Sequence, residues 1–153
     1  MSIILHFHKN EWEGDRMERG MLFSVETSKS IEKVIEGLKE KAPEYGFQVR
    51  HVLNLGDEYR AHGADVEEGF QIYQVIICSF KRSYQAVKAN NKRSVVLLLP
   101  KQMTVYRKGE KTVVDYLPFP KDFIVQILPD DEEFAERLAA TCQKITRLIE
   151  SAV

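Results

Sequence analysis

Apolar and polar residues alternate along residues 1–8, 47–55 and 102–107, and this alternation predicts β-strands. A period of two residues places apolar side chains on one face of a strand and polar side chains on the other. Residues 21–27 and 112–116 are two further predicted strands, so that five segments follow in the order 1–8, 21–27, 47–55, 102–107 and 112–116. The turn at Lys108-Gly109 predicts a β-hairpin between the last two segments, and the first two can pair as another.

Two continuous apolar runs, residues 75–78 and 95–99, show a different pattern. Runs of Val, Ile and Leu without alternation are typical of strands that are covered on both faces or lie at the middle of a sheet. The residues between the two runs predict a short amphipathic helix. We therefore expect a central strand, a helix and a second central strand that ends at Pro100.

A helical period of apolar residues predicts two longer helices. In the first, apolar residues recur at helical spacing from Ile31 to Ala42, after a cap at Ser28 or Ser30, and Pro43 ends the helix. The last helix is expected from residue 130 onward. It starts with acidic residues, as the helix dipole favours, and Asp130 with Glu133 fits a capping box.

Two shorter elements complete the expected set. Residues 57–62 predict one or two helical turns that end at Gly63, and residues 123–128 predict a short extended segment after two prolines. The order of elements predicts an α+β fold with a mainly antiparallel sheet and helices packed on one face. We expect one domain over residues 1–153, with an extra N-terminal strand and loop in residues 1–20 and the core in residues 21–153.

Apolar runs at the middle of the sheet would need cover on both faces, and two long helices are few for that purpose. A homodimer that buries the second face is therefore expected.

Composition narrows the possible partners. The chain has 22 basic and 23 acidic side chains, a balance that gives no reason to expect binding to nucleic acid or to an anionic membrane surface. Two cysteines 64 positions apart, without a signal-like segment or a run of 18 apolar residues, predict a reduced, cytoplasmic protein without a membrane span.

The central stretch resembles the family catalogued as domain of unknown function 302. Cys78 matches a family cysteine at a strand end, residues 84–89 match its Tyr/Ala-Leu-Lys-Ala helix, Leu99-Pro100 matches the second strand end, and Val105-Tyr106-Arg107 matches the hairpin. The resemblance implies a strand, helix, four strands, helix arrangement similar to the TATA-binding-protein-like fold, in proteins that are often dimers. It implies nothing about DNA, because a fold does not carry a function.

Two departures from the family pattern affect the expected chemistry. Ser79-Phe80 stands where the family has Asn-Pro, and Lys101 stands where it has its second cysteine. A function that needs both cysteines, as a redox pair or as metal ligands, is therefore weakened in this chain.

The candidate ligand-binding residues are Cys78, Ser79, Arg82 and Lys101. If the two predicted central strands are neighbours, these residues make a small cationic pocket for a carboxylate or phosphate. Cations near Cys78 would also lower the pKa of its thiol, which leaves open a redox or sulfur-handling function at that residue. The structural alternatives are that Cys78 is a small core residue and that Lys101 blunts a strand end in solvent.

Other chemistry is less well supported. His6 and His8 share one face of the first predicted strand and are weak metal-ligand candidates, because no third ligand lies nearby in the sequence. No phosphate loop, nucleophile elbow or paired-cysteine zinc spacing is present. We expect a dimeric module without a cofactor that binds a small ligand or a partner protein, more readily than an enzyme; thiol chemistry at Cys78 is the alternative.

Overall fold

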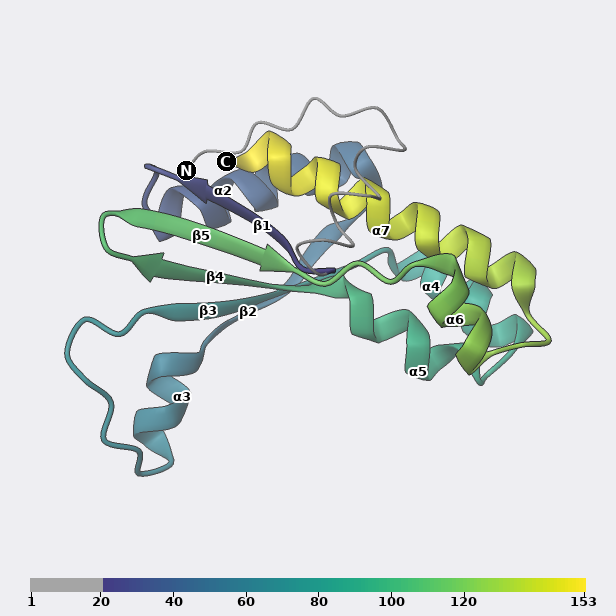
Figure 1. Ribbon diagram of the computed structural model, residues 1–153, viewed down its shortest axis with the longest axis horizontal. Coiled ribbons are helices and arrows are strands. Elements are labelled where there is room, and N and C mark those ends of the chain that lie inside the picture. Colours follow the sequence, from purple (N-terminus) through teal and green to yellow (C-terminus); the bar gives the residue numbers. More distant parts are fainter. Residues whose placement is uncertain (1–20) are drawn as a thin grey trace.

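The computed structural model describes residues 21–153, which form a five-stranded antiparallel sheet (Figure 1). The strand order is β1-β5-β4-β3-β2. The strands are β1 (Phe23–Thr27), β2 (Gln48–Asn54), β3 (Ile72–Cys78), β4 (Gln102–Lys108) and β5 (Lys111–Tyr116). The predicted hairpin is confirmed: β4 pairs with β5 from Met103 opposite Tyr116 to Lys108 opposite Lys111, and Gly109 turns the chain at a φ of 61°.

Two long helices, α2 (Ile31–Lys41) and α7 (Glu132–Ala152), lie side by side on one face of the sheet (Figure 1). The shorter helices are α3 (Leu55–Ala61), α4 (Phe80–Ala89), α5 (Arg93–Leu98) and α6 (Lys121–Ile127), with 3-10 turns η1 (Ala42–Tyr45) and η2 (Leu99–Lys101). This arrangement confirms the expected α+β fold with helices packed on one face of an antiparallel sheet.

Local sequence explains the position of α2. The Ser30 side chain accepts a hydrogen bond from the Lys33 backbone N–H at 3.2 Å, which satisfies one of the free amides at the helix start. Val34 and Leu38 are fully buried against α7 and the sheet. Burial of each such side chain contributes about 1.5–3 kcal/mol, so packing stabilises this helix more than its cap does.

The predicted second central strand, residues 95–99, is wrong. These residues form α5 and the start of η2, with Val96 and Leu97 buried while Val95, Leu98 and Leu99 are exposed. A short apolar run is compatible with either a helix or a strand, and only its surroundings decide between them. Here the buried Tyr116 hydroxyl donates a hydrogen bond to the Pro100 carbonyl at 2.6 Å and holds the turn that follows.

Two smaller predictions also need correction. Residues 123–128 do not form an extended segment, because α6 covers most of them and buries Ile124 in the core. The last helix starts at Glu132 after Asp131, not at a capping box on Asp130. The Asp131 carboxylate is bound by Arg93, and this tertiary contact is not visible in the local sequence.

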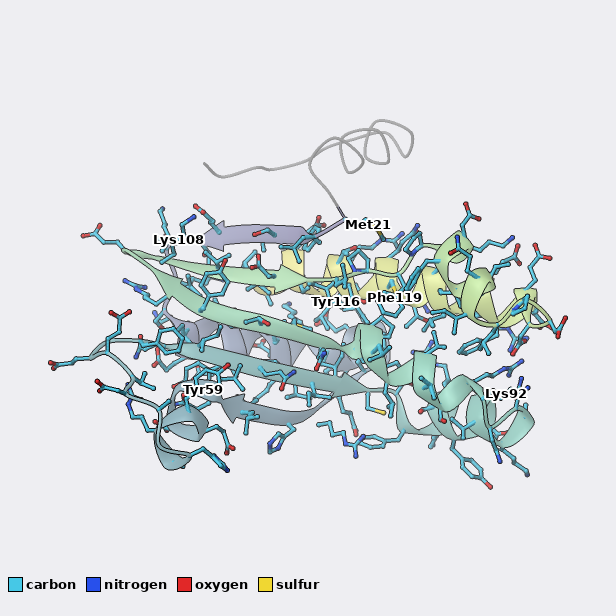
Figure 2. All side chains as sticks on the ribbon, turned by 60° about the horizontal axis from the view of Figure 1, so that its bottom comes forward. Met21, Tyr59, Lys92, Lys108, Tyr116 and Phe119 are labelled. Atoms are coloured by element: carbon cyan, nitrogen blue, oxygen red, sulfur yellow. The ribbon has the colours of Figure 1, made fainter. Side chains whose placement is uncertain are left out.

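The sheet face opposite α2 and α7 is in front in Figure 2 and carries polar pairs among its apolar residues. On it, the Gln74 side-chain amide donates to the Gln102 side chain, and the Tyr106 hydroxyl donates to Asp115 Oδ2 at 2.9 Å. Burial and the Asp115 contact raise the pKa of Tyr106 to about 12. Because residues 95–99 are outside the sheet, this face has less need of a covering partner than the sequence indicated. The homodimer stays a prediction.

The expected N-terminal strand, its hairpin with residues 21–27 and the division at residue 20 involve the first twenty residues, which lie outside the described part of the chain. Between residues 21 and 153, no helix is long and apolar enough to cross a membrane.

Candidate functional site

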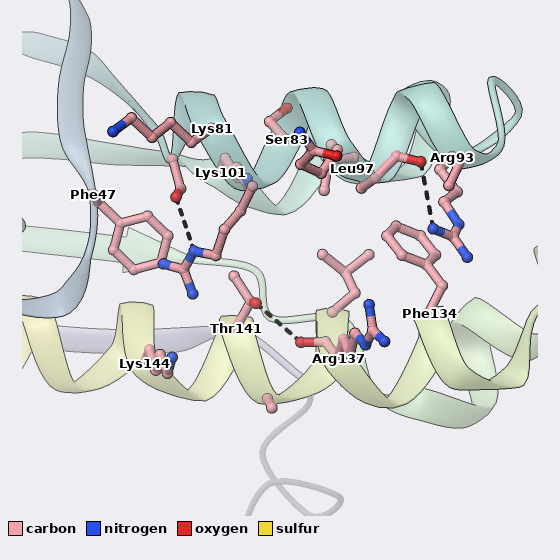
Figure 3. A pocket seen from close by; sticks show the side chains of 17 residues that line it. Phe47, Lys81, Ser83, Arg93, Leu97, Lys101, Phe134, Arg137, Thr141 and Lys144 are labelled. Carbon is pink, nitrogen blue, oxygen red and sulfur yellow. Dashed lines mark hydrogen bonds between the residues drawn. The ribbon is translucent and has the colours of Figure 1, made fainter.

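A cleft of about 540 Å³ separates α4 from α7 (Figure 3). Its lining comes from both helices, from α5 and η2, and from Phe47 just before β2. Figure 3 shows Lys81, Lys144 and Phe47 at one end of the cleft and Arg93 and Phe134 at the other. The two facing helices are about fifty residues apart in the sequence, so the cleft exists only in the folded chain.

Arg82 holds the first end of the cleft. Its Nε donates to Ser79 Oγ at 2.9 Å, one Nη donates to the Gly46 carbonyl at 3.3 Å, and its guanidinium lies 5.7 Å from the centre of the Phe47 ring. Gly46 has a φ of 82°, and a Cβ there would lie 2.5 Å from Arg82 Nη2. This glycine therefore supplies both the backbone turn and the space for the guanidinium.

Arg93 holds the second end. Its guanidinium binds both carboxylate oxygens of Asp131, at 2.6 and 2.8 Å, and lies 4.8 Å from the centre of the Phe134 ring. The two side chains are only 15% and 13% exposed, so this bidentate pair is well shielded from water. The hydrogen bonds from Arg93 lower the pKa of Asp131. Arg82 and Arg93 thus connect the α4–α5 segment to the rest of the fold on either side of the cleft.

Lys101 lies in the wall of the cleft and is unusually buried for a lysine, with 3% of its surface exposed. Burial lowers its pKa from the ordinary value of 10.5; nearby Cys78 raises the pKa and Arg82 lowers it further. Among residues 21–153, no carboxylate forms an ion pair with Lys101. The described lining of the cleft also contains no Asp or Glu.

Three of the four candidate residues named from the sequence, Ser79, Arg82 and Lys101, line this cleft together. The fourth, Cys78, is 3% exposed and is not part of the described lining. The expected pairing of residues 75–78 with a strand at residues 95–99 does not occur, because residues 95–99 are not a strand. Instead, β3 pairs with β4, and η2 places Lys101 just before β4 begins.

Sequence reasoning missed the contribution of α7 to the cleft. Phe134, Leu138 and Thr141 recur at helical spacing in the last helix, and they line the cleft together with Arg137 and Lys144. A signal was present in the spacing: Arg137, Thr141 and Lys144 follow one another at four and three residues, which places them on one face of a helix. The sequence could not show that this face lies opposite α4.

The histidine pair considered as metal ligands, His6 and His8, lies outside the described residues. In the part of the chain that the structure covers, no group of three or more His, Cys, Asp or Glu side chains is arranged to hold a metal ion.

Comparison with known proteins identifies the family to which this chain is similar. The family model described as "Domain of unknown function DUF302" matches residues 23–152. A crystal structure of an uncharacterized conserved DUF302 protein from Bacillus stearothermophilus is similar, with a TM-score of 0.66 and 16% sequence identity over 87% of this chain and 98% of that one. At this identity the likeness shows the fold alone. No curated protein matches the chain.

Proposed function

The chain belongs to the DUF302 family over residues 23–152, a family without an assigned function, and we propose that the cleft between α4 and α7 binds a small anionic ligand. The proposal is a binding role, with a carboxylate or phosphate group of the ligand held beside Lys101. The single observation that carries it is the buried Lys101 ammonium, which lines the cleft and has no ion pair with any described carboxylate.

A buried ammonium without a counter-ion costs free energy, because its hydration shell is not replaced. The lowered pKa of Lys101 expresses this cost, since burial is its largest cause. An anion in the cleft would offset the cost by supplying charge-assisted hydrogen bonds. Binding would then be strongest while Lys101 is protonated, so affinity is expected to fall on the alkaline side at a pH below 10.5.

The groups around Lys101 support the same ligand class. Lys81, Arg82 and Lys144 line the same end of the cleft, and none of the three has an ion pair with a carboxylate of residues 21–153. Arg82 is already oriented by Ser79 and Gly46, so little side-chain entropy is lost when it meets a ligand. The chain is nearly neutral overall, and this end of the cleft is a local exception.

The test compares inorganic phosphate and propionate binding in wild-type protein and in Lys101→Met, followed by amide chemical shifts. We expect saturable shifts in α4, η2 and α7, and an affinity lowered by about tenfold or more in the variant, because a hydrogen bond to a charged group contributes about 1.5–3 kcal/mol. Methionine has a similar shape and no charge, so the melting temperature should be unchanged or higher.

Lys88→Met is the matched control, because Lys88 is an exposed lysine of α4, lies outside the described cleft lining and gives the same change in net charge. It should bind phosphate as wild type does. The proposal fails if Lys101→Met binds both anions with wild-type affinity, or if the chemical shifts change away from the cleft.

Thiol chemistry at Cys78 is the second candidate, and one observation favours it: the Cys78 thiol is close enough to Lys101 to affect the pKa of that lysine. A cation beside a thiol favours the thiolate. Iodoacetamide alkylation of the native protein from pH 5 to 9, measured at each cysteine by mass spectrometry, distinguishes a functional thiolate from a core cysteine. A functional thiolate predicts fast reaction of Cys78 and slow reaction of Cys142, whereas a core cysteine predicts that both are protected until the protein unfolds.

A homodimer through the sheet face opposite α2 and α7 is proposed as the assembly. Its support is that the half-buried side chains of Ile72 and Ile76 in β3 lie on this face between the polar pairs. Light scattering at micromolar concentration should give twice the mass of one chain, and a monomer would exclude this assembly.

A further inference from the structure

The anion site proposed above occupies only one end of the cleft, and the two ends differ in chemistry. Lys81, Lys101 and Lys144 lie toward the end with Phe47, whereas Leu97 and Phe134 lie toward the end with Arg93 (Figure 3). From Lys81 to Ala89 the α4 wall spans about 12 Å at 1.5 Å per residue. A small inorganic anion would fill only part of this length.

The far end of the cleft is apolar. Leu97, Phe134 and Leu138 are 6%, 4% and 2% exposed and line the cleft together with the small side chains of Ala86 and Ala89. The small residues leave room beside α4, and the large ones supply the opposite wall. This lining fits hydrocarbon and offers few hydrogen bonds to a polar group.

Cations are present at the apolar end, but they are neutralised. Arg93 is paired in a bidentate manner with Asp131, and Arg137 forms an ion pair with Glu133. The cations at the other end, Lys81, Arg82 and Lys101, have no such partner among the described residues. The uncompensated positive charge of the cleft is therefore concentrated at one end.

We propose that the ligand is an amphiphilic organic anion, such as a medium-chain alkyl carboxylate, with its charged group at Lys101 and its hydrocarbon body along Leu97, Leu138 and Phe134. This inference rests on the proposed function, because it assigns the ligand class of the same site. A cleft of about 540 Å³ is within the range of small-molecule sites, which is about 300–1,000 Å³. The body of the ligand would displace water from the apolar end, and the head would supply the missing counter-ion.

The test is a series of alkyl carboxylates from propionate to dodecanoate, measured below their micelle concentrations by calorimetry and amide chemical shifts. Affinity is expected to rise about fourfold per added methylene until the apolar end is filled, because each buried methylene contributes a constant increment. Shifts at Ala86, Ala89 and Phe134 should grow with chain length, while those at Lys101 should stay the same.

Ala89→Gln tests the orientation without disturbing the core, because Ala89 is exposed yet lines the apolar end. The longer polar side chain should flatten the chain-length dependence and leave phosphate binding unchanged. Lys88→Gln, on the adjacent residue and outside the described lining, should leave both unchanged. Phosphate binding by each variant also shows that it is folded.

The possible results are distinguishable. Affinity that is independent of chain length, with phosphate binding at the cleft intact, overturns the amphiphile inference and leaves the anion site standing. Chain-length dependence that is unaffected by Ala89→Gln also overturns it, because the hydrocarbon then lies elsewhere. Absence of binding by phosphate and by every carboxylate removes the proposed function and the inference together.

Discussion

The two halves of α7 have similar patterns of apolar residues but different neighbours: the C-terminal half packs against α2, and the N-terminal half lines the cleft. In the C-terminal half, Ile145, Leu148 and Ile149 are fully buried, and a Cβ on Gly37 of α2 would lie 2.9 Å from the Ala152 carbonyl. In the N-terminal half, Phe134 and Leu138 are also buried, but they line a cleft. An apolar stripe therefore shows that a helix face is inside, but not whether the neighbouring element is in contact with it.

The difference comes from the partner helices. Gly37 lets α2 approach the backbone of α7 closely, and no bulky side chain separates the two helices there. On the other side, α4 and α5 are held by arginines at both ends, through Gly46 and Asp131. Both halves of α7 therefore contribute to the core, and the N-terminal half also forms a wall of the cleft for which binding is proposed.

The largest effect is expected in the C-terminal half. Leu148→Ala should lower the free energy of unfolding by about 2–5 kcal/mol, because it leaves a cavity in a tightly packed region. Urea denaturation measures the change, and the folded fraction should still bind phosphate with wild-type affinity. Arg147→Ala, on an exposed neighbour, should stay within about 0.5 kcal/mol. A loss of phosphate affinity in folded Leu148→Ala would contradict the division of the helix.

A smaller loss of stability is expected at the start of α7, where Asp131 binds Arg93 of α5. Asp131→Asn should lower the free energy of unfolding by about 1–3 kcal/mol, because the shielded Arg93 guanidinium loses its bidentate partner. The folded-state pKa of Asp131 is depressed, so its contribution is fully present above the ordinary carboxyl value of 3.8 and is lost as pH falls through the lowered value.

Unfolding curves of wild type and Asp131→Asn should therefore differ most at neutral pH and converge in acid below pH 3.8. A difference that does not change with pH across this window would show that the ion pair contributes nothing to stability.

Gly37→Ala sharpens the contrast between close packing and open cleft. Alanine favours a helix by about 1 kcal/mol over glycine, but its Cβ would lie 2.9 Å from a backbone oxygen of α7. Forced separation of packed helices typically costs about 1–3 kcal/mol, so we expect a net loss of about 1 kcal/mol and a lower melting temperature. Glu36→Ala, exposed on the same helix, should not lower it. A raised melting temperature in Gly37→Ala would mean that α2 and α7 are not in close contact.

The smallest effect on stability is expected at an exposed residue of the cleft lining. Lys144→Ala should change the free energy of unfolding by less than about 0.5 kcal/mol, because the side chain is exposed. Phosphate affinity should fall by about threefold, which corresponds to one exposed charge near the anion. Lys39→Ala, an exposed lysine of α2, is the control, and an equal loss in both variants would show a general charge effect and no site.

The sequence alone predicts an element correctly where the period of its apolar residues agrees with a local turn or cap residue. The β4–β5 hairpin follows from the alternation of residues 102–107 and the turn at Gly109, and α2 follows from its apolar spacing and the Ser30 cap. The family resemblance also came from residues in sequence order, and the matching family model confirms it. Ser79, Arg82 and Lys101 are candidates from the sequence because they follow the ends of two predicted central strands, and neighbouring strands would bring them together into a cationic pocket.

Tertiary contacts decided the rest. Residues 95–99 are apolar enough for a strand, but burial of Val96 and Leu97 on one side and the Tyr116 hydrogen bond at Pro100 favour a helix followed by a turn. The cleft requires α4 and α7 to face each other, and the burial of Lys101 depends on side chains that are distant in sequence. Sequence periods fix the face that each element buries, whereas long-range packing fixes what that face meets.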